Sequence, residues 1–206
     1  RWIYFDEEEK FRNSKKAKEN KKIVKEYHRY GIRVGATTGL SEIRQSALDN
    51  YPEVADWIAK DKDGKFIGWD PIKGKGLYTP CHNSPKYINY LIKLVSRWNV
   101  LGFDMFHLDN PGMPKCFCKY CHQKWARYIK NITGEKISLE DAIETKSKRL
   151  KTLFEEFRYK STLNLIQKVL DANRKLRKDF KIDANLSCAS PISIYILSSN
   201  KTVDII

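Results

Sequence analysis

Four of the five cysteines in the chain are spaced as the ligands of one metal ion. Three of them fall within six residues in a C-x-C-x2-C cluster, and the fourth lies 35 residues before it. Four thiolates in tetrahedral geometry make a closed structural zinc site. The sequence therefore predicts a structural Zn²⁺ ion bound by Cys81, Cys116, Cys118 and Cys121.

Other roles for these cysteines fit the pattern less well. A free cysteine often serves as a small buried hydrophobe, which suits the isolated Cys188 better than a loop with Lys115 and Lys119. Disulfides would strain the C-x-C pair and leave one of the five cysteines unpaired. His82 and His122 adjoin the expected ligands, so either is a reserve candidate to replace one of them.

A second candidate site lies at the end of a strand. Residues 102–109 are nearly continuous in apolar and aromatic side chains, as in a strand buried in a parallel sheet. Asp109 ends this strand, seven residues before Cys116, where α/β folds place their catalytic groups. His107 lies on the same side of the strand, because side chains alternate. Each of these residues also has a structural alternative. Asp109 could cap a helix or anchor a loop, His107 could be a buried histidine whose hydrogen bonds are satisfied, and Asp104 could make a structural hydrogen bond.

Helices and strands alternate along the chain, with turn residues between them. Periodicity and capping residues predict helices at 14–30, from Ser84-Pro85 onward, at about 121–131 and, with an interruption, at 139–179. Strands are predicted at 2–5, 32–38, 102–109, 181–187 and 203–206. Residues 39–83 are predicted to be mostly irregular. Such alternation is typical of parallel βα units.

The expected fold class is therefore α/β, a (β/α)8 TIM barrel present as a partial barrel. A closed barrel takes about 250 residues, whereas this chain has 206. We expect residues 1–206 to form a single barrel-type domain that is truncated at its C-terminus. The N-terminus is the second place at which this domain is a candidate for truncation. A doubly wound open sheet is the alternative, although the chain carries no G-x-G-x-x-G or P-loop signature.

Composition and charge limit the kinds of partner that we expect for this protein. The net charge is +14, but the lysines occur beside glutamates along helices, so solvated helix faces account for them and a nucleic-acid partner is not expected. No apolar run is long enough to cross a membrane, so no membrane partner is expected. A thiolate metal site favours a reducing compartment, here the cytoplasm. The sequence leaves oligomerisation open.

The segment at 108–125 resembles the region after the fourth strand of glycoside hydrolase family 42 β-galactosidases, and it is more similar still to the hypothetical glycosyl hydrolases allied to them. The motifs that carry the resemblance are LDNP at 108–111, CFCKYCHQKW at 116–125 and CHNSPKY at 81–87. The match extends over 164–187, where a helix leads to a strand ending in Asn185. The resemblance implies a TIM barrel, a zinc ion on the four cysteines and a carbohydrate substrate.

One position departs from the family. The resemblance aligns Asn110-Pro111 with the Asn-Glu pair whose glutamate is the general acid/base, and proline cannot protonate a leaving oxygen. Residues 102–109 also resemble the strand end of α-type glycosidases, in which the terminal aspartate, here Asp109, is the nucleophile. Glycoside cleavage needs two carboxyl groups, and the second would be Glu42, Asp70 or a residue beyond 206. We expect His107, Asn110 and Asn185, at the ends of their strands, to bind sugar hydroxyls.

Three functions follow. The first is acid/base cleavage of a glycosidic bond, with Asp109 as a catalytic carboxylate. The second is a carbohydrate-binding or structural barrel without catalysis, which Pro111 favours. The third and least favoured is a basic, zinc-containing nucleic-acid binder.

Overall fold

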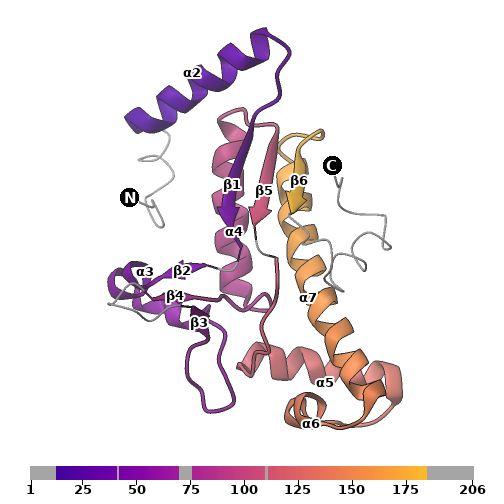
Figure 1. Cartoon of the computed structure of the whole chain (residues 1–206). Helices are drawn as coiled ribbons and strands as arrows, with labels where there is room; N and C mark the ends of the chain where they lie inside the picture. The colour runs from indigo at the N-terminus through magenta and orange to yellow at the C-terminus, as the bar shows by residue number, and fades with distance from the viewer. Residues whose placement is uncertain (1–12, 41, 70–75, 110, 185–206) are drawn as a thin grey trace. The chain divides into compact units, whose positions relative to one another are not determined.

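The computed structural model describes residues 13–40, 42–69, 76–109 and 111–184, and Figure 1 shows the path of the chain. The helices are α2 (Lys15–Arg29), α3 (Gln45–Asn50), α4 (Pro85–Val100), α5 (Lys119–Thr133), α6 (Leu139–Glu144) and α7 (Lys148–Arg174), with a 3-10 helix η1 (Pro52–Asp56). The strands are β1 (Gly35–Gly39), β2 (Ile43–Arg44), β3 (Gly68–Trp69), β4 (Leu77–Tyr78), β5 (Met105–Asp109) and β6 (Lys181–Ala184). The strands expected at 2–5 and 203–206 lie outside the described residues.

The chain divides into two compact units. Unit 1 comprises 1–39, 89–110 and 166–206, and unit 2 comprises 40–88 and 111–165. Unit 2 therefore consists of two segments, the first of which follows β1 along the chain and the second of which follows β5. The expectation of one barrel-type domain stays a prediction.

Unit 1 contains a parallel sheet in the order β1-β5-β6, as the alternation of strands and helices predicted. Along β5, Phe106 and Leu108 are fully buried, whereas Met105, His107 and Asp109, which alternate with them, are partly exposed. One face of the sheet is thus buried at β5, and the other, which we call the open face, is partly exposed. β6 begins at its predicted residue, Lys181, whereas β1 (Gly35–Gly39) and β5 (Met105–Asp109) each begin three residues later than predicted.

The residues at its two ends determine where α2, the helix that precedes β1, begins and ends. The Ser14 hydroxyl accepts a hydrogen bond from the Ala17 backbone N–H over 3.1 Å, which caps the N-terminus of α2. After the C-cap Tyr30, Gly31 has a φ of 72°, a left-handed conformation that glycine adopts at little cost. Both ends confirm the helix predicted at 14–30.

Asp104 anchors the amino end of β5, which confirms its predicted structural hydrogen bond. Its Oδ2 accepts hydrogen bonds from the Val34 backbone N–H and from His28 Nε2, each over 2.8 Å. Arg177 Nη1 lies 3.7 Å from Oδ1 of the same carboxylate. Burial raises the pKa of Asp104, but these partners outweigh it and lower the pKa below its ordinary value.

The described part of 39–83 is mostly irregular, as the sequence predicted, but short regular elements occur among these residues. They contain α3, η1 and a small antiparallel sheet in the order β2-β4-β3. The strands are only two residues long, too short for periodicity to reveal them. Gly68 is required in β3, because an added Cβ would lie 2.5 Å from the Leu77 backbone oxygen.

The second segment of unit 2 folds as three helices around a buried aromatic group. The helix predicted at 121–131 is α5, and Gly134, with a φ of 77°, terminates it. The predicted interruption of the later helical region falls between α6 and α7. Trp125 packs against Phe154 and Phe157 at ring-centroid distances of 5.9 and 5.5 Å. No helix among the described residues is long and apolar enough to cross a membrane.

Candidate metal centre and strand-end site

The four predicted metal ligands converge inside unit 2. The Sγ atoms of Cys81, Cys116, Cys118 and Cys121 all lie within 4.8 Å of one another. Cys81 Sγ is 3.4 Å from the Sγ atoms of both Cys118 and Cys121. A tetrahedron with metal–sulfur distances of about 2.3 Å has edges of about 3.8 Å. The sulfur positions therefore have the size of a four-thiolate zinc site, and the separations are too long for disulfides.

The cysteines belong to both segments of unit 2. Cys81 follows β4, and its backbone N–H donates to the Trp57 carbonyl oxygen over 2.6 Å. Cys118 is the N-cap of α5, and Cys121 lies in the first turn of that helix. The positive end of the helix dipole stabilises thiolates at this place. A bound metal ion would thus link the segment that follows β1 with the segment that follows β5.

Hydrogen-bond donors surround the sulfur atoms. The Cys118 backbone N–H donates to Cys116 Sγ, and Asn83 Nδ2 donates to Cys121 Sγ, each over 3.5 Å. Lys124 Nζ donates to Asn83 Oδ1 over 3.0 Å, which orients the amide so that its NH₂ group faces the sulfur. Such outer partners fix ligand geometry and tune metal affinity.

The thiols also influence each other's ionisation. Hydrogen bonds with Cys116 and its neighbours, together with burial, raise the pKa of Cys81 well above its ordinary value. Hydrogen bonds with Cys116 and Cys121 lower the pKa of Cys118 well below its ordinary value. Within the cluster of four cysteines, Cys118 thus favours the thiolate form, whereas Cys81 keeps its proton. A divalent cation that replaces the shared protons satisfies all four sulfur atoms, so this donor set fits zinc.

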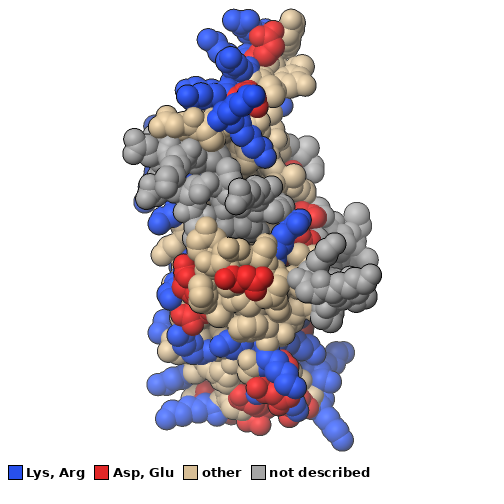
Figure 2. Space-filling view, turned by 90° about the vertical axis from the view of Figure 1, so that its left-hand side faces the viewer, with Lys and Arg blue, Asp and Glu red and all other residues tan. Residues whose placement is uncertain are grey.

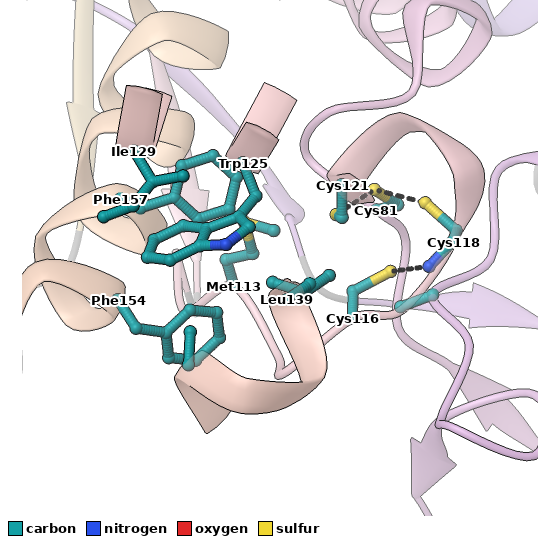
Figure 3. Close-up of a cluster of buried hydrophobic side chains, with 12 residues drawn as sticks. Cys81, Met113, Cys116, Cys118, Cys121, Trp125, Ile129, Leu139, Phe154 and Phe157 are labelled. Carbon is teal, nitrogen blue, oxygen red and sulfur yellow. Dashed lines mark hydrogen bonds between the residues drawn. The ribbon is translucent and has the colours of Figure 1, made fainter. Parts of the chain in front are cut away.

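An apolar core lies directly beside the sulfur atoms (Figure 3). Cys81 and Cys121 have no exposed surface, and Cys118 is 7% exposed. The sequence interpretation treated the surroundings of the cluster as a polar loop, because Lys115 and Lys119 are adjacent in sequence. The structure corrects this view, because the cysteines belong to one buried cluster with core side chains of unit 2: Met113, Trp125, Ile129, Leu139, Phe154 and Phe157.

Neither reserve histidine joins the sulfur cluster. His82 is fully buried, and its Nδ1 is 2.9 Å from Thr162 Oγ1. Burial and the nearby Arg158 charge lower the pKa of His82 to about 3, so the imidazole is neutral at pH 7. His122 Nε2 instead lies 3.4 Å from a carboxylate oxygen of Glu140.

The strand-end site belongs to unit 1. His107 and Asp109 lie on the open face of β5, as the alternation of side chains predicted. His107 Nδ1 is 2.6 Å from Asp183 Oδ1 on the neighbouring strand β6. The remaining predicted sugar ligands, Asn110 and Asn185, lie outside the described residues, so their positions stay predictions.

The two residues of this chain predicted as candidates for the second carboxylate, Glu42 and Asp70, stay predictions. Asp70 lies outside the described residues, and Glu42 belongs to unit 2. Sequence reasoning missed Asp183, although it had predicted the strand that carries it. The order of polar Lys181, apolar Ile182 and polar Asp183 is the sequence signal that could have found it, and in the structure Ile182 is buried while its two neighbours are partly exposed.

No protein-family model matches this chain, and no curated protein matches its sequence. Solved structures do match its fold. A β-galactosidase from the Antarctic haloarchaeon Halorubrum lacusprofundi has a TM-score of 0.62 at 13% identity, over 89% of this chain and 31% of that one. α-L-Fucosidase isoenzyme 2 from Paenibacillus thiaminolyticus has a TM-score of 0.54 at 18% identity, over 79% and 22%. A β-galactosidase from Bacillus circulans sp. alkalophilus has a TM-score of 0.52 at 15% identity, over 86% and 35%.

At these identities the likeness concerns the fold. The three neighbours are glycoside hydrolases with TIM-barrel folds, and this chain spans 22–35% of their length. Its small parallel sheet with connecting helices is consistent with part of such a barrel. The resemblance drawn from the sequence is therefore supported at the level of the fold, and kinship with the glycoside hydrolases, including family 42, stays a prediction.

Proposed function

We propose that this chain forms part of a glycoside-hydrolase-like barrel that acts on carbohydrate, with Asp109 as a catalytic carboxylate. One observation carries the proposal. Asp109 ends β5 on the open face of a parallel sheet, and solved structures similar in fold to this chain are glycosidases. In parallel α/β folds the carboxyl ends of the strands hold the groups that contact substrate.

The proposed chemistry is cleavage of a glycosidic bond by two carboxyl groups. Their spacing, about 5 Å in retaining enzymes and wider in inverting ones, would decide the stereochemical outcome. Asp109 supplies one of the two, as nucleophile or as proton-transfer group. His107, Asn110 and Asn185 hold sugar hydroxyls in this proposal.

We assign the four buried cysteines to a structural Zn²⁺ ion. Four protein ligands close the coordination sphere, so zinc in this site would stabilise the fold and leave no position for substrate. Its contribution would be to fasten together the two segments of unit 2, whose ligands lie far apart in the sequence.

A carbohydrate-binding barrel without catalysis is the second candidate. Pro111 favours it, because proline occupies the position at which the resemblance places the acid/base glutamate. This candidate keeps the open face of β5 as the sugar site but assigns no proton transfer to it.

The deciding experiment compares Asp109→Asn with wild type in the full-length protein. A panel of aryl glycosides and oligosaccharides measures hydrolysis, and calorimetry measures binding. We expect the variant to lose at least about 100-fold in kcat on any substrate that the wild type cleaves, with retained binding. The exposed Asp63→Asn is the matched control. Equal hydrolysis by variant and wild type removes Asp109 from catalysis, and binding without any turnover favours the second candidate.

Nucleic-acid binding remains the least favoured function. Figure 2 shows Lys and Arg side chains spread over the face in view, with Asp and Glu side chains among them. Some basic residues form ion pairs along their helices, such as Lys160 with Glu156 at 2.6 Å. These patterns are those of solvated helix faces. A salt-dependent affinity for generic DNA or RNA would revive this function.

A further inference from the structure

Three polar residues form a row across the parallel sheet of unit 1. The strand register pairs Thr37 of β1 with His107 of β5, and His107 with Asp183 of β6. All three lie on the open face: Thr37 is exposed, and the His107 and Asp183 side chains are 33% and 25% exposed. The His107–Asp183 contact is therefore built by the sheet itself, from residues directly opposite one another.

The contact fixes the chemical form of His107. A carboxylate can only accept hydrogen bonds, so the 2.6 Å contact requires that His107 Nδ1 carries the hydrogen and donates it to Asp183 Oδ1. In a neutral imidazole the other nitrogen, Nε2, is then the acceptor. Among the described residues, His107 is the hydrogen-bond partner of the Asp183 carboxylate.

A second histidine–aspartate pair in the same unit provides a contrast. His28 and Asp104 meet at the amino end of β5, where Asp104 also binds the Val34 backbone N–H and lies near Arg177. That carboxylate is surrounded by partners, as expected of a structural anchor. Barrel enzymes use the amino ends of strands for stability and the carboxyl ends for chemistry. His107 stands two residues before Asp109, which ends the strand.

We infer that Asp183 is a positioning residue that holds His107 with Nε2 as a hydrogen-bond acceptor for a hydroxyl group of the bound carbohydrate. The inference rests on the proposed function. Two residues along a strand span about 6.6 Å. The His107 and Asp109 side chains are therefore separated by about that distance along β5, on the same face. One sugar ring can therefore contact His107 through a hydroxyl while its neighbouring bond faces Asp109. Thr37, beside His107 in the register, offers a hydroxyl to the same ligand.

The test begins with the tautomer, which can be read without any ligand. Nitrogen-15 NMR of the histidine side chains in the full-length protein, assigned with His107→Gln, should show His107 protonated at Nδ1 in the wild type. In Asp183→Asn the amide can donate to Nδ1, so the Nε2–H form should appear. Asp104→Asn is the matched control, and it should leave the His107 signals unchanged.

The second readout is affinity for a glycan that the wild type binds, measured by calorimetry. Asp183→Asn should weaken binding by about 10- to 100-fold, the loss expected when a buried or semi-buried polar contact is misdirected. Asp104→Asn should lower stability and leave the affinity unchanged. A wild-type His107 protonated at Nε2, or an Asp183→Asn variant with unaltered tautomer and affinity, overturns the inference alone. A wild type that binds no glycan overturns the proposed function, and with it the ligand named here.

Discussion

Cys81 Sγ and Cys121 Sγ lie 3.4 Å apart, although the two residues are separated by 40 positions in the sequence. Cys81 comes from the segment of unit 2 that follows β1, and Cys121 comes from the segment that follows β5. The thiols are thus one of the places where the two segments of unit 2 meet, beside the backbone hydrogen bond from the Phe117 N–H to the Lys60 carbonyl oxygen. This convergence is the basis of the predictions about metal binding.

Replacing Cys81 should abolish stoichiometric zinc binding. We expect the purified wild type to contain about one Zn²⁺ per chain and Cys81→Ser to contain much less, because three thiolates leave the tetrahedral site open. Inductively coupled plasma mass spectrometry measures the metal content. Cys188→Ser is the control and should retain the ion. A zinc-free wild type purified under reducing, metal-replete conditions would contradict the assignment.

Asn83 should tune the same site without being a ligand. Asn83→Ala removes the hydrogen bond to Cys121 Sγ, and with it the contact to Lys124. Loss of such an outer partner typically weakens metal binding by about 10- to 100-fold. Competition with a chromogenic chelator measures the affinity, and the exposed Asn131→Ala serves as control. An affinity equal to that of wild type would assign Asn83 a packing role only.

Asp104 should stabilise unit 1 in a pH-dependent manner. Its pKa in the folded protein is below the ordinary value of 3.8, so the carboxylate contributes stability that is fully present above that value and disappears as the pH falls through the lowered pKa. Asp104→Asn should lower the free energy of unfolding by about 1–3 kcal/mol at pH 7. The deficit should shrink near pH 3 and below.

Urea unfolding at both pH values measures this difference, with Asp179→Asn as the control because its side chain is 75% exposed. A deficit of equal size at pH 7 and in acid would show that the Asp104 charge does not matter. The loss would then come from altered packing of the side chain.

Trp125 should be the most sensitive core position of α5. Its side chain is 1% exposed, it contacts Phe154 and Phe157, and its Nε1 donates to the Ile137 carbonyl oxygen over 2.9 Å. Trp125→Ala should cost about 3–5 kcal/mol of stability, because it leaves a large cavity. Ile132→Ala on the exposed side of the same helix should cost less than about 1 kcal/mol. Chemical denaturation followed by far-UV circular dichroism compares the two variants.

Local signals in the sequence were sufficient for several elements. Ser14 and Gly31 lie at the two ends of α2 and predicted where this helix begins and ends, because capping depends on the residues at the helix ends themselves. The strand that ends at Asp109 was recognisable because its apolar residues are continuous. The ligand spacing around Cys116 predicted which four cysteines would converge, because a closed tetrahedral site demands four donors.

Other features depended on partners that are distant in the sequence. The antiparallel sheet β2-β4-β3 arises from pairings of two-residue strands, which carry no periodic pattern of their own. The buried setting of the cysteines comes from aromatic side chains on α5 and α7, so the adjacent lysines were a misleading guide.

By itself the sequence determined the longer helices α2, α4, α5 and α7, the parallel βα alternation and the set of candidate metal ligands, because capping, periodicity and ligand spacing are properties of neighbouring residues. The tertiary structure alone decided that Asp183 faces His107, because strand register brings together residues 76 positions apart. It also decided that neither His82 nor His122 joins the sulfur atoms, since each histidine has a partner elsewhere in the fold.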